Sequence, residues 1–121
     1  MPSEQNVSQE TPENPDSRFL CAWKDAVAVA GEHVFSLGCR KPDEARHWRQ
    51  LTPDLNLIRA SVKKRSKADA IFVSALACFY NSEEGQKLLD KSGGSFGDMS
   101  LILDTRQRSI LATLFVNYQG W

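Results

Sequence analysis

The sequence predicts an all-α protein: a single compact irregular bundle of five to seven helices behind a disordered N-terminal tail. Apolar residues recur three or four positions apart in most segments. Pairs at capping-box spacing, such as Ser66 with Asp69 and Asp104 with Gln107, precede two of these segments. No Asn-Gly turn joins runs of alternating apolar residues, which is the pattern typical of a β-hairpin.

Residues 1–16 are expected to form a disordered acidic tail, and residues 17–121 the helical domain. The tail contains three prolines and only Met1 and Val7 as large apolar residues. Such a segment cannot bury enough apolar surface to offset the entropy lost on ordering. The remaining chain is long enough for one domain that folds without a metal or a disulfide.

The first helix is predicted over residues 17–37, with Asp16 or Ser17 as its N-cap and Gly38 as its end. Gly31 is then an interior glycine, at a small cost in stability or at a close helix contact. The predicted apolar face repeats at helical spacing and consists of Phe19, Trp23, Ala26, Ala30, Val34 and Leu37.

Two further helices are predicted over residues 41–51 and 52–65. In each, a proline (Pro42 or Pro53) is expected at the first helical position. An acidic residue follows each proline and favours the positive end of the helix dipole. Residues 42–65 therefore have the proportions of a helix–turn–helix, although they lack the glycine often found in its turn.

Residues 66–81 are predicted to form the central helix, because they are apolar on nearly every side. A buried strand is the competing interpretation, and the uninterrupted length and the alanines favour a helix. A helix capped by Ser82 and ended by Gly93, one or two turns over 96–103, and a last helix from Asp104 are expected to follow.

The aromatic residues Trp23, Trp48, Phe72, Phe79 and Phe115 are predicted to lie in the core, and Tyr118 continues the apolar stripe of the last helix. The C-terminal Trp121 leaves two alternatives open. It either folds back onto the domain or inserts into a partner.

Basic residues are concentrated in the middle of a chain whose formal net charge is zero. Residues 40–67 carry nine Lys or Arg and three Asp or Glu. One interpretation is a solvated helix end, where Lys and Arg favour the dipole. The other is a surface that contacts a partner or nucleic acid, with the candidate residues Arg46, Arg49, Arg59, Lys63, Lys64, Arg65 and Lys67.

No pattern in the sequence indicates an enzyme, a cofactor or a metal site. His33 and His47 lack the paired ligands of a zinc site. Cys78 lies in the most apolar segment and is expected to be a small core residue, and Cys21 has no recognisable base nearby in sequence. The stretch SGGSFG lacks the Lys-Ser or Lys-Thr that completes a phosphate-binding loop.

The predicted function is that of a non-catalytic protein–protein interaction protein, an adaptor or accessory protein. Its expected partner is an acidic protein surface. The alternative is a small nucleic-acid-binding regulator that uses residues 46–67, and an enzyme with dispersed catalytic residues is a third class. Three scattered cysteines, no secretory signal and no membrane-length apolar run predict a cytoplasmic protein without a membrane partner. No family motif is recognised, and only the general character of the chain resembles accessory proteins of bacteria and mobile elements.

Overall fold

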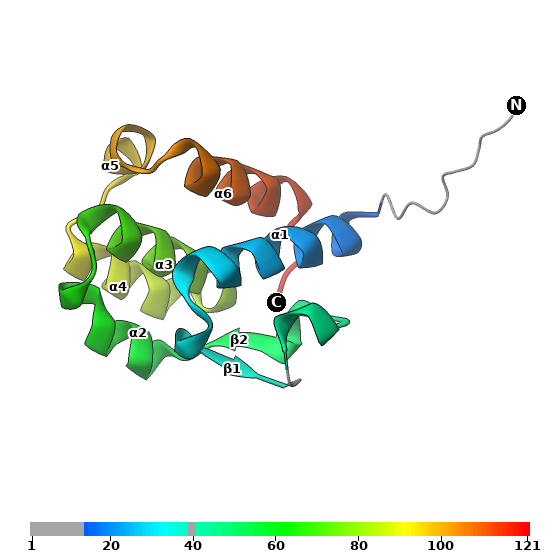
Figure 1. Cartoon of the computed structure of the whole chain (residues 1–121). Coiled ribbons are helices and arrows are strands. Elements are labelled where there is room, and N and C mark those ends of the chain that lie inside the picture. Colours follow the sequence, from blue (N-terminus) through cyan, green and yellow to red (C-terminus); the bar gives the residue numbers. More distant parts are fainter. Residues whose placement is uncertain (1–13, 39–40) are drawn as a thin grey trace, which may run out of the picture.

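A computed structural model describes residues 14–38 and 41–121, and it confirms a compact bundle of helices (Figure 1). In this part of the chain, six α-helices accompany one small antiparallel sheet of two strands. The elements are α1 (Pro15–Ala30), β1 (Phe35–Leu37), β2 (Leu51–Pro53), α2 (Leu55–Ser61), α3 (Lys67–Tyr80), α4 (Ser82–Ser92), α5 (Phe96–Ile102) and α6 (Thr105–Asn117). Residues 1–13 of the predicted tail lie outside the described residues. The first helix begins at Pro15 rather than at residue 17.

Helix α1 begins and ends earlier than predicted. The backbone N–H of Ser17 donates to Asn14 Oδ1 (2.8 Å), so the N-cap is Asn14 and not Asp16 or Ser17. The helix ends because Gly31 has a φ of +108°, a conformation that glycine adopts readily. Residues 32–37 leave the helix as one 3₁₀ turn and strand β1, although Val34 is buried as its spacing predicted.

The helix predicted over residues 41–51 is wrong. The segment forms two 3₁₀ turns, Pro42–Glu44 and Trp48–Gln50, and then strand β2. Side chains replace a helical hydrogen-bond ladder: the Arg49 N–H donates to His47 Nδ1 (3.1 Å), and the Arg46 N–H donates to Gln50 Oε1 (2.7 Å). Without this first helix, the helix–turn–helix over residues 42–65 does not form.

Strand β2 pairs with β1, which places Phe35 opposite Pro53 and Leu37 opposite Leu51. Pro53 is therefore in a strand and does not begin α2. The N-cap of α2 is Asp54, whose Oδ1 accepts from the Leu57 N–H (3.1 Å).

The remaining helix ends agree closely with the sequence. The Ser66 hydroxyl caps α3, and Asp104 and Gln107 form a reciprocal capping box at the start of α6. Gly93, with a φ of +78°, ends α4. Two ends differ from the prediction. The N-cap of α4 is Asn81 rather than Ser82, and α2 ends at Ser61, before a 3₁₀ turn over Val62–Lys64, rather than at residue 65.

Helix α3 is the centre of the bundle, and residues 70–77 are all buried. Helix α4 folds back along it immediately after Asn81 (Figure 1). Helix α6 lies along α1 and is parallel to α3. The side-chain amide of Gln107 donates to Asp69 Oδ1 (3.2 Å) where α3 and α6 begin, and the Tyr118 hydroxyl donates to the Phe79 carbonyl (2.9 Å) where they end.

Aromatic rings fill the space between α1, the end of α3 and the sheet. Phe19 lies within 6 Å, centroid to centroid, of Trp23, Trp48, Phe79 and Tyr118. Trp121 folds back onto this cluster, with its ring 5.2 Å from that of Trp23. The core positions of Trp23, Trp48, Phe72 and Phe79 are confirmed, whereas that of Phe115 is wrong, since 68% of Phe115 is exposed.

We predict that Phe72→Ala and Leu76→Ala each lower the free energy of unfolding by roughly 2–5 kcal/mol, as truncations in a packed core do. Both side chains are fully buried in α3. Lys64→Ala, at an exposed position, is expected to stay within about 0.5 kcal/mol of the parent. Urea denaturation measures all three, and an unchanged stability in Phe72→Ala would contradict the placement of the core.

Gly85→Ala is expected to destabilise the protein by roughly 1–3 kcal/mol, because the added methyl group overpacks the α3–α4 contact. A Cβ at Gly85 would lie 2.5 Å from the Cα and N atoms of Cys78, and backbone cannot easily move aside. Gly97→Ala is the matched control: its Cβ would meet nothing closer than Ser95 Oγ at 3.8 Å. We expect the control to be neutral or slightly stabilising in the same denaturation experiment.

Candidate functional site

Two of the seven predicted basic site residues are used to hold the fold together. The Arg59 guanidinium pairs with Glu84 Oε1 (3.2 Å) and donates to Asn56 Oδ1 (2.9 Å), which joins α2 to α4. Arg65 donates to the Ala30 carbonyl (3.0 Å) and to Ser61 Oγ (3.1 Å). Arg65 therefore binds the carbonyl end of α1 to the α2–α3 junction.

The other five basic residues lie in two separate places. Arg46 and Arg49 are exposed in the segment before β2, at the end of the sheet away from α2 (Figure 1). Lys63, Lys64 and Lys67 are exposed at the junction of α2 and α3. We call these three the lysine cluster. Within the described residues, their ammonium groups have no hydrogen bond and no ion pair.

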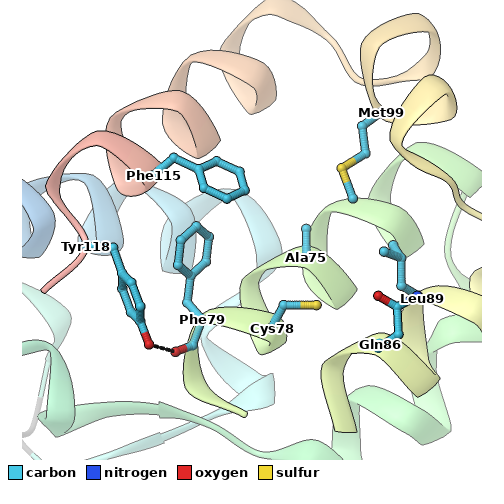
Figure 2. A pocket seen from close by; sticks show the side chains of 8 residues that line it. All are labelled: Ala75, Cys78, Phe79, Gln86, Leu89, Met99, Phe115 and Tyr118. Carbon is cyan, nitrogen blue, oxygen red and sulfur yellow. Dashed lines mark hydrogen bonds between the residues drawn. The ribbon is translucent and has the colours of Figure 1, made fainter. Parts of the chain in front are cut away.

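A different feature, an apolar groove, lies between α4 and α6 with α3 as its floor. The groove has a volume of about 400 Å³. Figure 2 shows the Phe115 ring above that of Phe79 on one side and Met99 and Leu89 on the other. The lining residues are Ala75, Cys78, Phe79, Gln86, Leu89, Met99, Phe115 and Tyr118.

The packing of the helices explains why this groove exists. Gly85 lets α4 approach α3 closely, and α6 lies mainly against α1. The polar contacts between α3 and α6 occur near their two ends, through Gln107 and Tyr118. The groove therefore opens between the two walls over the buried Ala75 and the half-buried Cys78 of α3.

A second, smaller hollow of about 260 Å³ lies between α5 and α6 and shares Met99 and Phe115 with the groove. Phe96 lines this hollow and is 85% exposed. Val116 is 78% exposed and follows Ala112, which also lines the hollow, by four residues on α6, so the two are neighbours on the helix surface. We call the groove, the hollow and Val116 together the α5–α6 apolar surface. Contiguous exposed apolar area of this kind marks binding sites on proteins.

The polar groups at this surface are few and have partners. The Tyr118 hydroxyl donates to the Phe79 carbonyl, and the Gln86 amide donates to Asp90 Oδ1 (2.9 Å). Arg108, in the hollow, donates to the Ser100 carbonyl (3.2 Å) and to Thr105 Oγ1 (3.4 Å). The surface therefore offers apolar contact rather than a set of reactive groups.

The Cys78 thiol lies in the groove, with its sulfur directed into it (Figure 2). Burial raises the pKa of this thiol above its ordinary value, because the thiolate would lose hydration. Cys78 is thus a poor nucleophile near neutral pH. Among residues 14–38 and 41–121, no three His, Cys, Asp or Glu side chains are grouped so that they could hold a metal ion.

Sequence reasoning missed the groove because its lining comes from four helices. The nearest signal was the pair Phe115–Val116 beside Leu114. Three consecutive large apolar residues do not all face one side of a helix, so a helix that is covered on one side only must expose at least one of them. Leu114 is fully buried, and Phe115 and Val116, which follow it, are exposed.

A scan against protein-family models, a search of curated proteins and a search of solved structures each found no match to this chain. Among the helices of the described residues, none has the length and the apolar character needed to cross a membrane.

We predict that iodoacetamide alkylates Cys78 more slowly than Cys21 at pH 8. Cys21 is exposed on α1, whereas Cys78 is half-buried and has a raised pKa. The alkylation rate of Cys78 is also expected to rise further above about pH 9, where an ordinary thiol with a pKa near 8.5 is already mostly thiolate. Peptide mass spectrometry at several pH values measures both rates. Equal rates in the folded protein would contradict this placement of Cys78, and in urea the difference should vanish.

Proposed function

We propose that this chain is a non-catalytic interaction protein, an adaptor or accessory protein that binds a partner polypeptide through the α5–α6 apolar surface. One observation carries the proposal: exposed apolar side chains concentrate around a groove that is itself apolar. Phe96, Phe115 and Val116 expose most of their area at this place. Aromatic side chains of this kind supply much of the binding energy at protein interfaces.

The shape of the groove supports an apolar helix face as the bound element. Helices α4 and α6 form its walls, and the small residues Ala75 and Cys78 lie on its floor. A small floor lets the backbone of a bound helix approach closely, and grooves of this kind take apolar side chains spaced three or four residues apart. The partnered polar groups around it leave little for a polar small molecule to bind.

The lysine cluster supports a second candidate, contact with an acidic protein surface or with nucleic acid. Lys63, Lys64 and Lys67 are exposed and without a carboxylate partner in the described part of the chain. Because no helix–turn–helix forms, we expect any nucleic-acid contact to be with phosphates. Its affinity would then fall by about 0.9 log units per log unit of salt for each phosphate contact.

The two candidates are separated by capturing partners from the native cell lysate with three forms of the protein: the parent, Phe115→Glu, and the triple variant Lys63→Ser, Lys64→Ser, Lys67→Ser. We expect Phe115→Glu to lose the captured protein, because a carboxylate would have to be desolvated in the apolar contact. The lysine variant is expected to retain it. Arg65 is left unchanged, since its two hydrogen bonds make it part of the fold.

The opposite results have equally specific meanings. Retention of every captured protein by Phe115→Glu would overturn the apolar surface as the binding site. Loss only in the lysine variant would favour the acidic partner, and loss after nuclease treatment would favour the nucleic-acid regulator. Thermal melts of all forms check the fold, and little change is expected because every substituted side chain is mostly exposed.

A further inference from the structure

We infer that the polypeptide bound at the α5–α6 apolar surface is a second copy of this chain, so that the protein is a two-fold symmetric homodimer. The inference rests on the proposed function and names its partner. The location of the exposed large apolar side chains supports a contact at this surface. In the described residues these are Leu57, Phe96, Leu101, Phe115, Val116 and Tyr118, and three of the six, Phe96, Phe115 and Tyr118, line the groove or the hollow.

Protruding side chains and hollows occur together on this surface. Phe96 stands at the hollow of about 260 Å³, and Phe115 lies between that hollow and the groove of about 400 Å³. A surface that carries both can pack against a second copy of itself. A two-fold axis near Met99 and Phe115, which line both depressions, would let each copy place Phe96 against the depression of the other.

A helix from an unrelated protein covers this surface less completely. Such a helix would fill the groove and contact Phe115, yet Phe96 at the hollow and Val116, one turn beyond Ala112 on α6, would remain in water. A second copy brings the same broad face and can cover all three. This is why the second copy is the better occupant.

The available area fits a modest dimer interface. A phenylalanine buries about 150–250 Å² when it is covered. With Val116 and the linings of the two depressions, the surface reaches on the order of 500–700 Å² per copy, against about 800 Å² per partner in an interface of standard size. We therefore expect a reversible dimer.

The electrostatics of the contact are simple. Among residues 14–38 and 41–121, Arg108 is the one charged residue that lines the hollow, and none that is charged lines the groove. Its hydrogen bonds to the Ser100 carbonyl and Thr105 hydroxyl hold the guanidinium along α5 and α6. With so little charge at the contact, dimerisation should depend weakly on salt, unlike any binding at the lysine cluster.

Sedimentation of the full chain over a range of concentrations tests the inference. We expect a monomer–dimer equilibrium, and Phe96→Ser and Phe115→Ser should each weaken it more than about tenfold, as loss of a central aromatic contact does. Leu101→Ser is the matched control. Leu101 is as exposed as Phe96, at 85%, and lies on the same helix, but five residues at about 100° each turn it about 140° away.

Alkylation of Cys78 gives a second readout in the same samples. A second copy over the groove should slow the reaction at Cys78 as the concentration rises, while the exposed Cys21 on α1 reacts at an unchanged rate. A chain that stays monomeric at several hundred micromolar overturns the inference. So does a dimer that forms equally well with Phe115→Ser and leaves Cys78 unprotected.

The sedimentation and capture experiments distinguish failure of the homodimer from failure of the α5–α6 apolar surface as a binding site. If the chain is monomeric and Phe115→Glu still loses a captured protein, the second copy is wrong and the binding surface stands. If Phe115→Glu loses nothing and the chain is monomeric, both are wrong.

Discussion

Helix α3 has to be covered on nearly every side, because residues 70–77 are all buried and the one polar side chain among them, Ser74, donates to the Ala70 carbonyl of its own helix. Burial of so many apolar side chains is the largest favourable term in the stability of a domain of this size. The other elements are arranged around this requirement. Helix α4 covers one side through the close contact at Gly85, α1 covers another, and α2 and the β1–β2 sheet close the remaining end.

Helix α6 packs closely on α1 and does not pack equally closely on α3. Its buried face carries Ile110 and Leu114, and the helix packs mainly against α1. It contacts α3 through hydrogen bonds near its two ends and through the Phe115 ring, whose centroid lies 5.1 Å from that of Phe79. Phe115 and Val116 follow Leu114 and point away from that face, so they are exposed. The groove is the space left where α6 rests on α1 rather than on α3. The candidate binding surface is thus a consequence of how the central helix is covered.

In the described residues, several polar and titratable groups are buried or already have hydrogen-bond partners. Burial raises the pKa of the Cys78 thiol, the Tyr118 hydroxyl and the Gln86 amide have hydrogen-bond partners, and two of the arginines in the basic region support the fold. Besides Arg46 and Arg49, the exposed groups available for contact form two surfaces, the apolar area on α5 and α6 and the three lysines at the α2–α3 junction. These two surfaces differ in the response to salt that each would produce, which follows from the charge that they carry.

The sequence by itself determined the helical class, the central position of residues 70–77 and the caps at Ser66, Asp104 and Gly93, because these depend on residues a few positions apart. Tertiary structure alone decided three other features. Residues 32–37 leave the helical path at Gly31 because they pair with residues 51–53, which are distant in sequence. Arg59 and Arg65 lie in a basic run, yet their partners Glu84 and Ala30 come from other helices. Phe115 continues an apolar stripe, but α1 and α3 together cover only part of it, and periodicity cannot say how wide a face the neighbouring helices will bury.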